Sequence, residues 1–143
     1  MTELKEKADK KVNDGWIRTW MMIEVMAASE AAAKSALEKH VDSLEREDKI
    51  ILYKKDYKEV KEIKGPSPEK PSMYSYVVEI EVVSQNLDKL AYIAMNYGPA
   101  AFEILEPNEI KVEAGEAQAL LSSIADLVHK YARMGIGGIV VKT

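Results

Sequence analysis

Cysteine is absent from this sequence of 143 residues. Its absence excludes disulfide bonds, thiol catalysis and metal sites built from thiolates. The chain also lacks any run of about 18 apolar residues, the length that a membrane-spanning helix needs. Its first 15 residues are rich in charge, unlike a secretory signal. We therefore expect a cytoplasmic protein with no membrane partner.

Signatures of catalysis are also scarce. The two histidines, His40 and His129, lie in separate segments, and no H-x-x-x-H or G-x-S-x-G motif marks a metal site or a nucleophile. The glycine-rich run at 135–138 follows an expected helix and lacks the Gly-Lys-Ser/Thr ending of a phosphate loop, so we interpret it as a helix cap and turn. We expect no catalytic residue and no cofactor, and an enzyme is the less favoured class.

The composition is that of a folded domain. Hydrophobic residues make up 47% and charged residues 31% of the chain, which argues against wholesale disorder. Lys and Glu dominate the charged residues, a composition reported for thermophiles. The net charge of -4 is uneven, because residues 79–126 carry nine acids against two bases. Such a segment repels phosphate backbones, so nucleic acid is an unlikely partner there.

Residues 73–112 read as strand, helix and strand. Apolar side chains at every second position place one set on a single face of a sheet. That set is Tyr74, Tyr76, Val78, Ile80 and Val82. Asn86 offers an N-cap and Gly98 with Pro99 ends the helix, after which Phe102 and Ile104 belong to a second strand.

The same order begins earlier, at residue 16. Residues 16–26 alternate with apolar side chains on both sides, which predicts a central strand covered on both faces. A helix is expected over Ser29–Glu47, followed by a strand from Lys49 that becomes a charged arm reaching Ile63. The proline-rich stretch 65–72 then predicts an exposed hairpin tip.

Assembled in order, these elements predict an α+β fold: a ferredoxin-like βαββαβ sandwich over residues 16–113, with an antiparallel sheet whose first and third strands lie in the middle. Residues 1–15 are expected to form a charged tail or short helix. Residues 114–143 add a helix over Ala117–Arg133, with Gly135 as its C-cap, and a possible short edge strand in the last residues.

The run MNYGPAAFEILEP at 95–107 resembles conserved archaeal proteins of unassigned function, and the layout of residues 16–113 resembles that of ACT domains. ACT domains place a glycine where the first strand meets the first helix, and there they form an amino-acid pocket at a subunit interface. This chain has Ala27, Ala28 and Ser29 at that junction. The resemblance therefore implies a subunit interface like that of ACT domains, whereas the missing glycine argues against their amino-acid pocket.

With two helices on one face, the other face of the expected sheet exposes Trp20, Met22, Met26 and Val77. Apolar side chains grouped on one surface are typical of an association site. We expect either the third helix or a second subunit to cover them. The sequence thus favours a non-enzymatic regulatory or scaffolding module that forms a homodimer or higher homo-oligomer through this face and can hold a small-molecule ligand at the interface.

Two other functions remain open. Glu24, Glu79 and Glu81 would share the same face on two neighbouring strands, and three carboxylates suit a hard divalent cation, as in a metal-dependent enzyme. Alternatively, the arm at 53–64 interleaves five lysines with Tyr53 and Tyr57, as single-strand nucleic-acid binders do. Three acids in the same arm reduce its charge to +2, which is typical of a solvated hairpin.

Overall fold

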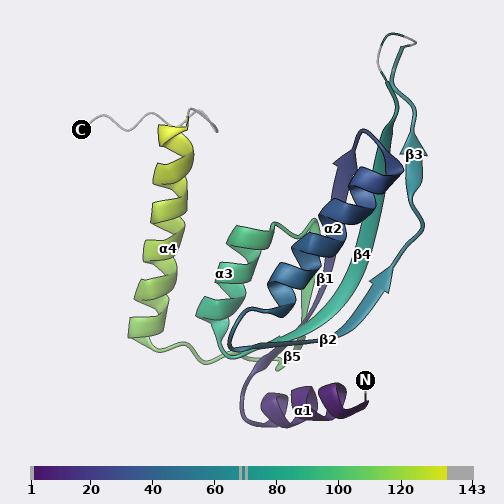
Figure 1. Cartoon of the computed structure of the whole chain (residues 1–143). Coiled ribbons are helices and arrows are strands. Elements are labelled where there is room, and N and C mark those ends of the chain that lie inside the picture. Colours follow the sequence, from purple (N-terminus) through teal and green to yellow (C-terminus); the bar gives the residue numbers. More distant parts are fainter. Residues whose placement is uncertain (1, 68, 70, 135–143) are drawn as a thin grey trace.

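A computed structural model describes residues 2–67, 69 and 71–134 of the chain (Figure 1). These residues form an α+β fold with four helices and one open, antiparallel sheet of five strands. In order, the elements are α1 (Thr2–Asn13), β1 (Ile17–Ala27), α2 (Glu30–Glu45), β2 (Ile50–Tyr57), β3 (Lys61–Ile63), β4 (Met73–Ser84), α3 (Leu87–Tyr97), β5 (Ala101–Glu106) and α4 (Ala114–Arg133). None of the described helices is long and apolar enough to cross a membrane.

The sheet has the strand order β2-β4-β1-β5, and β3 pairs with the first residues of β4. The two long strands, β1 and β4, therefore lie in the middle, where the alternating sequence patterns predicted them. Their antiparallel register sets Trp20 opposite Glu81 and Met22 opposite Glu79. This register decides which side chains meet on each face, because a shift of one residue would exchange the two faces.

The main core lies between the sheet and helices α2 and α3, which cover one face (Figure 1). The predicted apolar set of β4 points into it, and its members Val78, Ile80 and Val82 are at most 1% exposed. The helices contribute Ala33, Leu37, Val41, Leu44, Leu90 and Ile93. Small and branched side chains at helical spacing thus meet the strands along a continuous apolar layer.

Both core helices begin where the sequence predicted and α3 also ends there, whereas α2 ends at Glu45, two residues before the expected Glu47. The Ser29 hydroxyl accepts a hydrogen bond from the Ala32 N–H at 3.1 Å, and the Asn86 side chain accepts one from the Lys89 N–H at 2.9 Å. Each satisfies a donor that the first helical turn leaves unpaired. At the end of α3, Gly98 has φ 54°, the left-handed conformation that glycine adopts without steric cost.

Helix α1 packs on the opposite face of the sheet, at one end. Its Ala8 is fully buried against Val83 of β4, with Ile51 and Tyr53 of β2 beside them. The first residues are thus an ordered helix of 12 residues with a docking surface of its own. The sequence signal for this helix is the helical spacing of Leu4, Ala8 and Val12 in an otherwise charged segment.

Helix α4 packs beside α3 and does not cover the open face of the sheet, on which α1 covers only one end (Figure 1). We expected either this helix, the third one in the sequence prediction, or a second subunit to cover that face. The helix does not cover it. The helix also begins earlier than expected, at Ala114. The expected C-cap at Gly135, the glycine-rich turn at 135–138 and the short edge strand all lie outside the described residues.

Candidate functional site

The predicted association residues lie together on the open face of the sheet. Trp20, Met22 and Val77 are half-buried there, and Met26 is 51% exposed. The structure adds two neighbours, because Ile63 of β3 pairs with Met73 of β4, which shares a face with Val77. We call these six residues the open-face patch: Trp20, Met22, Met26, Ile63, Met73 and Val77. Sequence reasoning missed two of them because the pairing of β3 with β4 is set by a hairpin register that no motif specifies.

Each of the three predicted metal-binding carboxylates has a hydrogen-bonding partner of its own. Glu24 accepts a hydrogen bond from the Ser75 hydroxyl, Glu79 accepts one from the Trp20 ring N–H at 3.0 Å, and Glu81 accepts one from the Tyr53 hydroxyl. Among the described residues, no group of three or more His, Asp or Glu side chains is placed to hold a metal ion. The metal site thus stays a prediction from the sequence.

Ion pairs lie next to the open-face patch on its β2 side. The Lys58 ammonium lies 3.1 Å from Glu79, and the Lys54 ammonium lies 3.4 Å from Glu81. The hydrogen bond from Lys58, followed by the one from Trp20, lowers the pKa of Glu79. Lys55 is also paired, with Glu45 of α2 at 3.1 Å. Three of the arm's five lysines therefore already meet carboxylates within the chain, which leaves less charge for a phosphate backbone.

Arg18 is the centre of a polar network at the other end of the open face. Its guanidinium pairs with Glu106 of β5 at 2.7 Å and with Asp9 of α1, and it donates a hydrogen bond to the Tyr53 hydroxyl. Burial opposes the charge, but the hydrogen bonds to Tyr53, Glu106 and Asp9 outweigh it, so the pKa of Arg18 is raised. Burial, then the hydrogen bond to Glu81, raises the pKa of Tyr53 to about 12. This network ties α1 to three strands.

A second polar cluster joins the ends of α2 and α3. The Tyr97 hydroxyl donates a hydrogen bond to Glu47 at 2.7 Å, and the Lys89 ammonium lies 3.1 Å from the same carboxylate. Nε2 of His40 lies 2.9 Å from the backbone oxygen of Tyr97. His40 thus has a structural partner at the margin of the core, while His129 is exposed on α4. The two histidines are not brought together.

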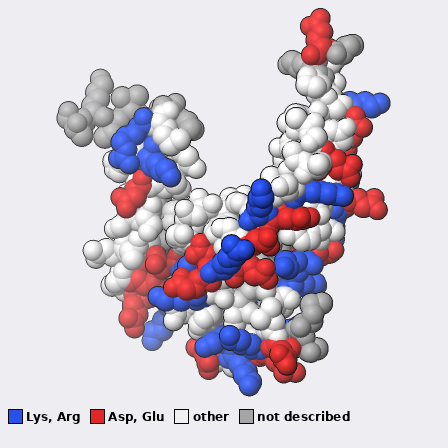
Figure 2. Space-filling view, viewed as in Figure 1, with Lys and Arg blue, Asp and Glu red and all other residues white. Residues whose placement is uncertain are grey.

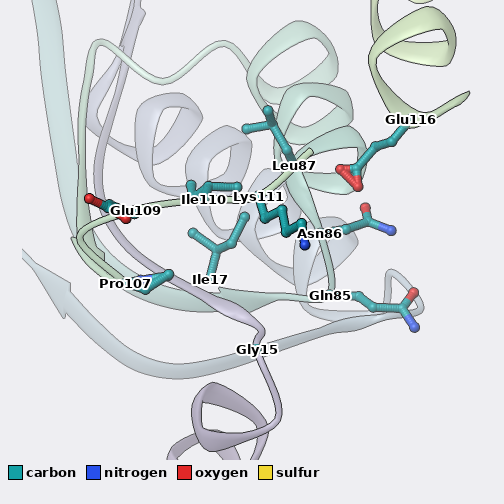
Figure 3. A pocket seen from close by; sticks show the side chains of 10 residues that line it. All are labelled: Gly15, Ile17, Gln85, Asn86, Leu87, Pro107, Glu109, Ile110, Lys111 and Glu116. Atoms are coloured by element: carbon teal, nitrogen blue, oxygen red, sulfur yellow. The ribbon is translucent and has the colours of Figure 1, made fainter. Parts of the chain in front are cut away.

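A cavity of about 360 Å³ lies between the start of β1, the β4–α3 turn and the β5–α4 connection (Figure 3). Asn86 and Lys111 line it, together with Glu116 from the first turn of α4. Oε2 of Glu116 is shielded from solvent and has no hydrogen-bond partner among the described residues. Sequence reasoning missed this cavity, because its walls come from three connections far apart in the chain.

A family model matches residues 18–142 of the sequence, and this range includes both central strands and the α4 helix. The chain belongs to the MJ0538 family. No curated protein and no solved structure matches it. In this member of the MJ0538 family, the candidate surfaces are therefore assigned from geometry alone.

Proposed function

We propose that this member of the MJ0538 family is a non-enzymatic regulatory or scaffolding module that self-associates through the open-face patch. In this proposal the sheet has the ferredoxin-like, ACT-type layout, with two helices on one face and a second subunit on the other. The observation that supports it most directly is the exposure of Met26, Ile63 and Met73 at 51%, 45% and 36% on neighbouring strands of one face. Contiguous exposed apolar surface of this kind is a feature of association sites.

The surroundings of the patch fit an interface better than a catalytic site. Glu24, Glu79 and Glu81 lie among the patch residues on β1 and β4, and they accept hydrogen bonds from Ser75, Trp20 and Tyr53 within the chain. Carboxylates that already have hydrogen-bond donors can be buried at an interface at a lower cost than unpaired ones. Burying the patch would stabilise a dimer by about 25 cal/mol for each Å² of apolar surface removed from water.

Sedimentation equilibrium of the purified chain and of its Met26→Glu variant tests the proposal. Met26 is already 51% exposed, so the substitution leaves the monomer fold intact and places a charge inside the proposed interface. The matched control is Phe102→Glu, because Phe102 is 53% exposed but pairs with Met21 and so belongs to the helix-covered face. We expect Met26→Glu to lower the average mass and Phe102→Glu to leave it unchanged. A wild-type monomer at micromolar concentration refutes the proposal.

A small-ligand site is a second candidate function, and the unpartnered Oε2 of Glu116 favours it. A ligand in this cavity would need a hydrogen-bond donor for Glu116 and an acceptor or anionic group for Lys111. A thermal-shift screen of small metabolites finds such a ligand, because binding to the folded state alone raises the unfolding temperature. The same screen on Lys111→Ala checks the site: a shift that survives this substitution places the ligand elsewhere.

A further inference from the structure

Helix α4 has an apolar side that stays exposed in the part of the chain that the structure describes. It is the longest helix, with 20 residues, yet none of its described side chains is buried. The shorter α3 buries three residues in 11, and α2 buries four in 16. An amphipathic helix normally directs its apolar stripe into a core, because that burial supplies most of its stability.

The apolar side of α4 consists of two adjacent stripes, and the first of them borders α3. Leu120 and Leu127 are half-buried, and Leu127 lines a groove with Tyr92 and Met95 of α3. The second stripe consists of Leu121, Ile124, Val128 and Tyr131, whose spacing of three, four and three residues is that of a helix-pairing seam. Leu121, Ile124 and Tyr131 are 65%, 43% and 43% exposed. We call these four residues the α4 seam.

The charge along α4 indicates which occupant fits the seam. Acids lie at its start, with Glu113 as the N-cap residue and Glu116 in the first turn, and bases lie in its last turn, Lys130 and Arg133. In Figure 2 the blue side chains lie near the far end of the α4 arm, with a small red patch just below them, and further red side chains lie towards the base of the arm. A helix with one acidic and one basic end is complementary to a copy of itself that runs in the opposite direction, and the helix dipoles are then also opposed favourably.

We propose that the α4 seam is the contact surface for the α4 seam of a second copy of this chain, in an antiparallel pair related by a two-fold axis. This contact is separate from the open-face patch and does not depend on it. The helix is about 30 Å long, and the seam, from Leu121 to Tyr131, spans about 16 Å of it and is about 10 Å wide. That area is smaller than the roughly 800 Å² that each partner contributes to a stable interface of standard size. The pairing is therefore concentration-dependent and strengthened at low salt.

Sedimentation equilibrium across protein concentration measures the pairing. The Leu121→Glu and Ile124→Glu double variant replaces two exposed seam residues, so circular dichroism should show an unchanged fold, while the dissociation constant rises at least tenfold. The Lys130→Glu and Arg133→Glu double variant makes both ends of α4 acidic and should weaken the pair most at low salt. Phe102→Glu is again the control. Unchanged association in both double variants overturns the proposal.

Engineered cysteines determine the direction of the pair, since the chain has none of its own. The Ala114→Cys variant labels the start of α4 and the Ala132→Cys variant labels its end. With a short bis-maleimide, an antiparallel pair links the two variants to each other when they are mixed, and neither variant links to itself. Linkage of each variant to itself shows a parallel pair and overturns the proposal, as does the absence of any linkage.

The same measurements distinguish this pairing from association through the open face. If both surfaces associate, Met26→Glu and the Leu121→Glu and Ile124→Glu double variant each reduce a larger assembly to dimers. If only the seam double variant lowers the mass, the seam is the interface and the function proposed for the open face is refuted. If only Met26→Glu lowers it, the seam proposal is refuted.

Discussion

Replacing Arg18 by methionine tests whether one side chain holds α1 on the sheet. Methionine keeps the unbranched apolar stem of arginine but makes none of its hydrogen bonds. The guanidinium reaches Asp9 on α1, Tyr53 on β2 and Glu106 on β5, and the Arg18 side chain is only 12% exposed. Its loss removes the polar link between the helix and the strands while Ala8 still packs.

The expected loss of stability is about 2 kcal/mol, close to one charge-assisted hydrogen bond. Three such bonds do not add up to three times this value, because they share one guanidinium and their acceptors differ in exposure. The side chains of Asp9 and Glu106 are 48% and 54% exposed, so both carboxylates regain water and no buried, unpaired charge remains. In a chain of this size, the unfolding temperature should fall by roughly 4–8 °C.

Thermal unfolding followed by circular dichroism measures this change, and hydrogen exchange locates it. We expect the amides of α1 to lose protection well before those of β4, since only α1 depends on the network for its docking. Arg46→Met is the control, because Arg46 is exposed at the end of α2 and should change stability by about 0.5 kcal/mol or less. An unchanged unfolding temperature in Arg18→Met, or equal loss of protection in α1 and β4, would refute this reasoning.

Three further predictions concern the core, the polar cluster and the carboxylates. Leu37→Ala should lower the free energy of unfolding in urea by about 2–5 kcal/mol, because Leu37 is fully buried, whereas Leu4→Ala at a site 41% exposed should cost far less. Hydrogen bonds from Tyr97 and then Lys89 lower the pKa of Glu47, so its contribution to stability is complete above the unfolded carboxyl pKa of about 4.3 and is lost as the pH falls through the folded value. Glu47→Gln should therefore make the stability measured between about pH 3 and 6 less dependent on pH. Calorimetric titration with Mg²⁺ should give no binding heat, since each open-face carboxylate already has its own donor; saturable heat would revive the metal hypothesis.

The fold was predictable where hydrophobic periodicity and capping residues agree. Alternation in β1 and β4 specified the two central strands and their faces, and Ser29, Asn86 and Gly98 marked helix ends. These signals come from residues close together in the chain, so they can be recognised in a single sequence. The docking of α1 depends on contacts between residues 8, 51 and 83, which no local pattern records.

The candidate sites were predictable only in part, for the same physical reason. The face shared by Trp20, Met22, Met26 and Val77 follows from alternation along two strands. Which donor each carboxylate meets depends instead on register and on side-chain rotamers. Arg18, for example, shares a face with Glu24, Glu79 and Glu81 but pairs with Asp9 and Glu106. A cavity whose walls come from separate connections, such as the one lined by Lys111 and Glu116, produces no periodic pattern in the sequence.

The position of α1 has a practical consequence for measuring assembly. The helix docks on the open face of the sheet, at the end near Val83 and away from Met26 and Met73 (Figure 1). An affinity tag fused ahead of α1 would therefore extend from the same face of the sheet as the open-face patch. Purification handles should be cleaved off before any mass is determined, or an apparent monomer could reflect the tag.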